Sequence, residues 1–64
     1  MIQVNGIREV FRDESVATML ARMSIDARGV AVALNGEVVV RSQWSTTRLS
    51  DEMIVEIVTA VAGG

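Results

Sequence analysis

The dipeptide Asn-Gly occurs twice in this chain, at positions 5–6 and 35–36, each time between two apolar runs. Asn and Gly both tolerate the positive φ angles that a two-residue type I′ hairpin turn requires. Each dipeptide therefore predicts a β-hairpin, the first over residues 1–11 and the second formed by residues 30–34 and 37–40. The two hairpins bracket a segment that has room for one helix.

This intervening segment has the spacing of an amphipathic helix. Its apolar residues recur at intervals of three and four positions: Val16, Met19, Leu20 and Met23. Such spacing places them all on one helical face. Ser15 is expected to cap the helix, because its hydroxyl accepts a backbone N–H of the first turn. The helix is expected to end between Ser24 and Gly29, because Gly29 readily leaves the helical conformation.

After the second hairpin, the polar stretch from Ser42 to Ser50 predicts a short irregular or 3₁₀ connection. Residues 53–61 are then dense in β-branched side chains and predict a strand that is covered on at least one face. An odd number of strands with one crossover helix favours a mixed sheet, in which the last strand lies beside the first and runs parallel to it. We therefore predict an α+β fold of the β-grasp type, with a mixed sheet of four to five strands packed on one main helix.

Composition argues against several classes of function. The chain has no Cys and no His, which removes disulfides, thiolate nucleophiles, imidazole bases and the usual zinc ligands. It has six Arg, no Lys and eight Asp plus Glu, a balance that is poor for neutralising nucleic-acid phosphates. No apolar stretch reaches the roughly 20 residues of a membrane span, and no signal-peptide pattern is visible. We expect no metal, no bound cofactor, no intrinsic enzymatic activity, no nucleic-acid or membrane partner, and a cytoplasmic location.

The chain ends Val61-Ala62-Gly63-Gly64, directly after the predicted last strand. Residues 1–61 are expected to form the folded domain and residues 62–64 a flexible tail that can thread a narrow channel, because glycine has no Cβ. The reactive group is then the α-carboxylate of Gly64, which is ionised at neutral pH and must be activated before it can accept a nucleophile. Adenylation by ATP would supply the leaving group, and a sulfur nucleophile would then give a thiocarboxylate. Two terminal glycines also occur by chance, so the tail alone leaves both interpretations open.

Other residues have a structural explanation beside a functional one. Trp44 is expected to cap the core rather than to contact a partner, and Met19 and Met23 are expected to fill the core. The acidic pairs 13–14 and 51–52 are expected to be solvated caps without a catalytic role. The apolar surplus of the predicted sheet either leaves one face exposed for docking or is fully covered. The residues concerned are Val38, Val39, Val40 and Val58.

The segment from Val30 to Trp44, with its hairpin and tryptophan, and the closing segment from Thr59 to Gly64 resemble the ThiS family of sulfur carriers in thiamin biosynthesis. Further similarity lies at Arg48-Leu49, Asp51 and Val55-Glu56-Ile57, and the resemblance covers the whole chain. It implies a ubiquitin-like β-grasp fold and adenylation of Gly64 by a ThiF-type adenylyltransferase. It also implies a thiocarboxylate loaded from a sulfur donor such as a cysteine desulfurase, and sulfur transfer to the thiazole synthase ThiG.

Gly63 and Gly64 match the family tail directly, and Ala62 is expected to thread the partner active site with Gly63. The family often has Pro at the position of Val40, and often Asp-Gly-Asp where this chain has Asp51-Glu52-Met53. Glu52 must then adopt a positive φ at some energetic cost, or the loop must be rebuilt.

Three alternatives to this function remain open from the sequence. The first is a MoaD-like sulfur carrier for molybdopterin, which shares the fold and the tail. The second is a ubiquitin-like modifier attached through Gly64 to lysines of other proteins, although this chain has no lysine on which polymers could form. The third is an interaction module in which the glycines have no chemical role.

Overall fold

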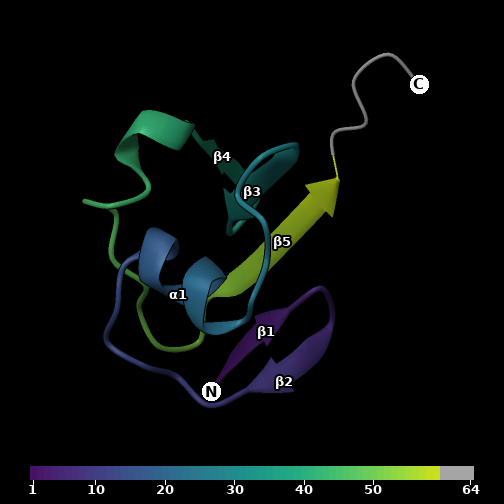
Figure 1. Ribbon diagram of the computed structural model, residues 1–64. Coiled ribbons are helices and arrows are strands. Elements are labelled where there is room, and N and C mark those ends of the chain that lie inside the picture. Colours follow the sequence, from purple (N-terminus) through teal and green to yellow (C-terminus); the bar gives the residue numbers. More distant parts are fainter. Residues whose placement is uncertain (60–64) are drawn as a thin grey trace.

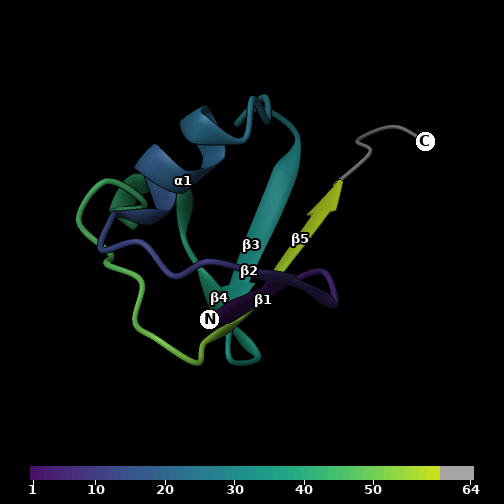
Figure 2. The same ribbon diagram turned by 90° about the horizontal axis from the view of Figure 1, so that it is seen from below.

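The structure, a computed structural model, describes residues 1–59. In these residues one α-helix packs on one face of a mixed β-sheet (Figures 1 and 2). The elements in chain order are β1 (Ile2–Val4), β2 (Ile7–Glu9), α1 (Val16–Arg22), β3 (Val30–Leu34), β4 (Glu37–Val39), the 3₁₀ helix η1 (Arg41–Gln43) and β5 (Ile54–Thr59). The strand order within this part of the chain is β2-β1-β5-β3-β4.

The last strand, β5, lies at the centre of the sheet, between the two hairpins (Figure 1). It runs parallel to β1, with Val4 opposite Val55, and antiparallel to β3, with Val30 opposite Thr59. The predicted β-grasp fold and the insertion of the last strand beside the first are therefore confirmed. Residues 60 and 61 of the predicted strand lie outside the described residues, as does the predicted domain boundary after residue 61.

Both Asn-Gly pairs form the expected turns, with φ of 51° and 82° at Asn5 and Gly6 and almost the same values in the second turn. The strands are shorter than predicted, however. Glu9 lies opposite Ile2, the first residue of β1, so β2 has no partner beyond it and the predicted hairpin does not extend to residue 11. In the second hairpin Val40 leaves the sheet because it caps η1.

The core lies between α1 and the sheet. Its fully buried side chains include Val16, Met19 and Leu20 from the helix and Val32 and Val55 from the strands. The predicted core roles of Trp44 and of the two helical methionines are confirmed: Met19 is buried, Met23 packs against the core, and Trp44 is 4% exposed. The Trp44 indole N–H donates a hydrogen bond of 2.9 Å to the carbonyl of Val39.

The helix begins as predicted and ends earlier than predicted. Ser15 Oγ accepts the backbone N–H of Thr18 at 3.1 Å, which is the expected N-cap. The helix ends at Arg22, before the predicted range, because Ser24 adopts a positive φ of 58°. The Ser24 N–H then bonds to Ala21, and the Ile25 N–H to the Leu20 carbonyl, the pattern of a Schellman motif. This termination does not need Gly29, which lies in the following loop.

The prediction that the acidic pairs are solvated caps is wrong for Glu14. Its residue surface is only 8% exposed, and its carboxylate accepts three hydrogen bonds from the Arg22 guanidinium, the shortest of them 2.6 Å. The hydrogen bond with Glu14 raises the pKa of Arg22 above its ordinary value. Glu14 is therefore a structural anion that ties the loop before α1 to the last turn of the helix.

Glu52 has a φ of 66°, so it adopts the left-handed conformation that the missing glycine would have taken more easily. We expect the substitution Glu52→Gly to raise the free energy of unfolding by about 1 kcal/mol, because L side chains in this region cost roughly 1–2 kcal/mol. Urea denaturation measures the change. Glu37→Gly, at an exposed glutamate in β4, is the control and should lower stability by about 0.5–1 kcal/mol. Equal losses for the two variants would contradict the expectation.

Candidate functional site

The predicted carrier residues Ala62, Gly63 and Gly64 lie outside the described residues, and β5 is the described element that leads to them. This strand is held on both sides, by five residue pairs with β3 and two with β1. The β3 pairing continues to Thr59, the last residue described. The last described strand is therefore a central strand of the sheet and not an edge strand.

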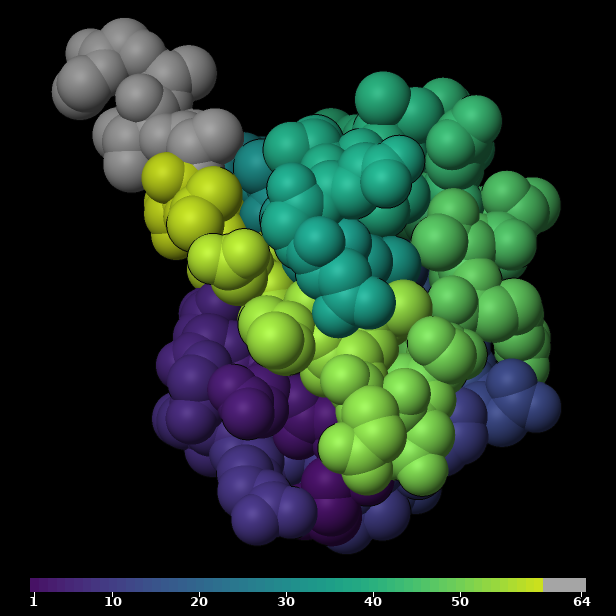
Figure 3. All heavy atoms as spheres, turned by 180° about the vertical axis from the view of Figure 1, so that it is seen from behind, coloured from purple at the N-terminus to yellow at the C-terminus, as the bar shows by residue number. Residues whose placement is uncertain are grey.

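The sheet has one face packed on α1 and one face turned away from it, which we call the outer face (Figure 3). Side chains alternate along each strand, so the neighbours of the buried Val4, Val32 and Val55 point outward. From the strand register, the outer face comprises Gln3, Arg8, Ala31, Ala33, Val38, Ile54, Glu56 and Val58.

Three large apolar side chains of the outer face are exposed: Val38 by 69%, Val58 by 57% and Ile54 by 49%. No described residue covers them, so the sequence-based alternative of a fully covered sheet is wrong for this part of the chain. Val39 was also a candidate for this face, but it lies opposite the buried Val32 and packs on the core. Val40 is exposed yet lies outside the sheet.

Ile54 is the outer-face residue that sequence reasoning missed. The signal was present, because Ile54, Glu56 and Val58 alternate along the last strand and Val58 was recognised. A continuous apolar run hides this alternation, since its inward and outward residues are equally hydrophobic. The pairing of β5 with β1 and β3 shows which set points outward.

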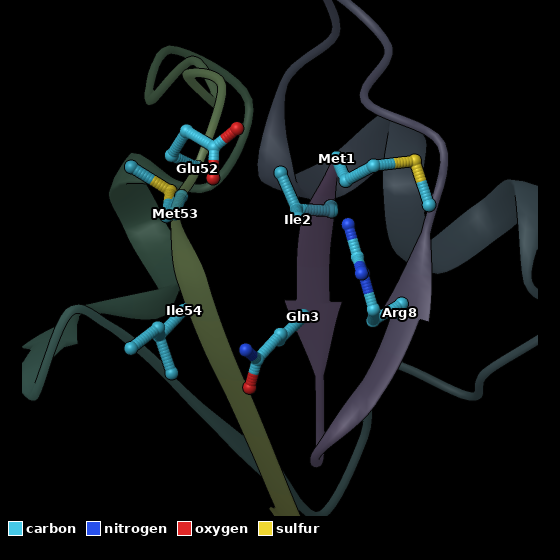
Figure 4. A pocket seen from close by; sticks show the side chains of 7 residues that line it. All are labelled: Met1, Ile2, Gln3, Arg8, Glu52, Met53 and Ile54. Atoms are coloured by element: carbon cyan, nitrogen blue, oxygen red, sulfur yellow. The ribbon is translucent and has the colours of Figure 1, made fainter.

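A shallow cleft of about 250 Å³ lies at the start of β5, beside the amino end of β1 (Figure 4). Its wall includes Gln3 and Arg8 from the first hairpin and Glu52 and Ile54 from the other side. Neither Arg8 nor Glu52 takes part in an ion pair with another residue of the described chain. Five residues of extended strand separate Ile54 from Thr59, a distance of roughly 17 Å, so the cleft is at the end of β5 opposite the tail.

Two carboxylates of the described residues have a pKa below the ordinary value. The Met1 α-ammonium, 2.6 Å from the Asp51 carboxylate, lowers the pKa of Asp51, and Arg28 lowers the pKa of Asp26 through a side-chain hydrogen bond. Both carboxylates lie in loops rather than on the outer face. Within residues 1–59 no group of three or more acidic residues could hold a metal ion, and no helix is long and apolar enough to cross a membrane.

Comparisons with known proteins agree on one family. Residues 2–64 match the model of the ThiS family. The crystal structure of a thiamine biosynthesis protein, ThiS, from Geobacter metallireducens is similar, with a TM-score of 0.87 and 30% identity over 98% of this chain and 97% of that one. A solution structure of a thiamine biosynthesis protein from the same organism gives a TM-score of 0.74 and 31% identity over 98% of this chain and 86% of that one. No curated protein matches the chain.

Proposed function

We propose that this chain, which belongs to the ThiS family, is a sulfur carrier of thiamine biosynthesis that acts through the α-carboxylate of Gly64. The family match, which extends over residues 2–64 and so includes both glycines, is the observation that carries the proposal. The position of β5 supports it, because a strand held on two sides gives the tail a fixed point of departure. The chain is then a carrier on which other proteins act.

The proposed chemistry has two steps at one carboxylate. A Gly64 carboxylate oxygen attacks the α-phosphorus of ATP and expels pyrophosphate, which leaves an acyl-adenylate with AMP as leaving group. A sulfur nucleophile at the oxidation level of sulfide then attacks the carbonyl carbon and AMP departs. One carboxylate oxygen leaves with the AMP, and the product is the thiocarboxylate. A ThiF-type adenylyltransferase would catalyse the first step. With a cysteine desulfurase as donor, the sulfur arrives as a persulfide, and a thiol reductant must reduce it by two electrons to the sulfide level, being itself oxidised to a disulfide.

We further propose that the outer face is the surface on which the adenylyltransferase docks. Exposed apolar patches of this kind mark interaction sites, and this one includes Val58, one residue before the last described residue of β5. A partner seated there would bind the carrier and receive its tail at the same time. The thiazole synthase ThiG, the proposed acceptor, must receive the same tail, so the two enzymes are expected to bind in turn.

Intact-protein mass spectrometry tests the proposal directly. The chain is incubated with ATP, a ThiF-type adenylyltransferase from the same organism and sodium sulfide as sulfur source. The expected product has the mass gain of one oxygen exchanged for one sulfur, and omission of sulfide should leave the adenylate. An unchanged mass, with an enzyme that adenylates another ThiS-family carrier, would refute the proposal.

The molybdopterin and protein-modifier alternatives share the adenylate but differ in the acceptor. The loaded carrier is therefore mixed with either a thiazole synthase or the large subunit of a molybdopterin synthase, each together with the small-molecule substrate that accepts the sulfur, and loss of the sulfur mass is followed. Loss with the thiazole synthase alone is the expected result. Loss with the molybdopterin subunit alone would assign the chain to that pathway.

A further inference from the structure

We propose that Asn5 is a positioning residue for the carrier tail, because its side-chain amide extends the β1–β5 pairing beyond the end of β1 and holds the carboxyl half of β5 in place. The inference rests on the proposed function, since it concerns the path of the tail toward the adenylating enzyme. It assigns to Asn5 a role distinct from that of forming the hairpin turn.

Asn5 makes three hydrogen bonds to β5. Its backbone N–H donates to the carbonyl of Val55 at 2.9 Å. Its side-chain Oδ1 accepts the N–H of Ile57 at 2.7 Å, and its Nδ2 donates to the carbonyl of Ile57 at 3.0 Å. A side-chain carboxamide has a C=O acceptor and N–H donors, as a backbone peptide unit has. The Asn5 side chain therefore makes the hydrogen bonds to Ile57 that a further residue of β1 would make if the strand were longer.

This contact changes where β5 is held. On the β3 side the strand is paired through Thr59, but on the β1 side the residue pairing ends at Val55. Without the Asn5 amide, the carboxyl half of β5 would be bonded on one side only within the described chain. Segments with few hydrogen bonds and exposed side chains open most readily, and Val58 is 57% exposed. With the Asn5 side chain in place, the last residue of β5 that is hydrogen-bonded on the β1 side is Ile57 rather than Val55. Ile57 is closer to the tail.

The chain contains a natural control for this role. Asn35 occupies the same position in the second Asn-Gly turn, with a φ of 50° against 51° for Asn5. Its Oδ1 accepts the N–H of Ile54 at 2.8 Å, and its backbone N–H donates to the Ile54 carbonyl at 2.7 Å. The two asparagines thus share their turn geometry and bind the same strand. They differ in where they bind, because Asn35 holds the start of β5 and Asn5 holds the half that leads to the tail.

The test compares Asn5→Gly with Asn35→Gly. Glycine accepts the positive φ of both turns, so each variant keeps its hairpin and loses only the side-chain hydrogen bonds. Adenylation is followed by ATP–pyrophosphate exchange with a ThiF-type adenylyltransferase. We expect Asn5→Gly to raise the KM for the carrier by about tenfold with little change in kcat, because the loss of ordered contacts weakens binding of the tail. Asn35→Gly loses its side-chain hydrogen bond at Ile54, at the end of the outer face far from the tail, and should change the KM by no more than about twofold.

Amide hydrogen exchange of the isolated carrier gives a second readout that does not depend on any enzyme. Asn5→Gly should accelerate exchange at Ile57 and Val58 and leave Ile54 unchanged, whereas Asn35→Gly should accelerate Ile54 alone. Equal KM increases in the two variants, or Val58 exchange that does not respond to Asn5→Gly, would overturn the inference. Failure of the proposed function gives a different result: the unsubstituted chain is then not adenylated at all.

Discussion

A chain without Gly64 is expected to gain no sulfur. Removal of this residue leaves the α-carboxylate of Gly63, displaced by one residue, which corresponds to about 3.5 Å of extended chain. Reacting atoms must approach to roughly 3–3.5 Å with the right orientation, and a misplacement of 1 Å can cost about a hundredfold in rate. The displaced carboxylate therefore cannot reach the α-phosphorus of ATP while the folded domain remains docked. Intact-protein mass spectrometry after incubation with ATP, adenylyltransferase and sulfide measures the outcome.

Deletion of Ala62 is the matched control for the loss of Gly64. It shortens the tail by the same length but keeps the Gly63-Gly64 end. If reach from β5 limits the reaction, both deletions should abolish loading to the same extent. If the identity of the terminal residues matters more, the Ala62 deletion should retain part of the activity. Normal loading of the chain that lacks Gly64 would contradict the assignment of Gly64 as carrier residue.

The substitution Val58→Asp is expected to weaken binding to the adenylyltransferase by on the order of a hundredfold, about 2–3 kcal/mol. Val58 is 57% exposed on the outer face, in the half of β5 that leads to the predicted tail. A carboxylate there must be dehydrated without a partner when the two proteins associate, whereas in the free carrier it remains in water. The affinity can be measured by isothermal titration calorimetry, and urea denaturation should show nearly unchanged stability.

Val10→Asp provides the comparison for Val58→Asp. Val10 is 64% exposed, so it resembles Val58 in type and accessibility, but it follows β2 and lies outside the sheet. This variant should bind the adenylyltransferase as the unsubstituted chain does. Equal losses of affinity in the two variants would show that the outer face has no special role in docking.

Local chemistry was sufficient to predict the elements of this fold. The two Asn-Gly pairs form their turns and Ser15 caps the helix. Each of these features depends on neighbours within a few residues, so sequence alone reveals it. Strand ends were predicted less well, because the end of β2 depends on where β1 begins on the opposite side of the hairpin.

The candidate site was also predicted only in part from the sequence. The sequence indicated Gly63 and Gly64 because their function depends on chain position and on the absence of side chains, and their assignment remains a proposal. It indicated Val58 as an exposed residue but missed Ile54, because the register that turns Ile54 outward is set by pairing with β1, more than fifty positions earlier in the chain.

The sequence by itself determined the two hairpin turns, the N-cap of the helix and the apolar face of the helix, since these follow from the backbone preferences and spacing of adjacent residues. Only the tertiary structure decided the register in which β5 pairs with β3, that Glu14 is buried against Arg22, and that the Asn5 amide holds Ile57. The physical reason is that hydrogen bonds between distant segments depend on register and approach, which no local preference specifies.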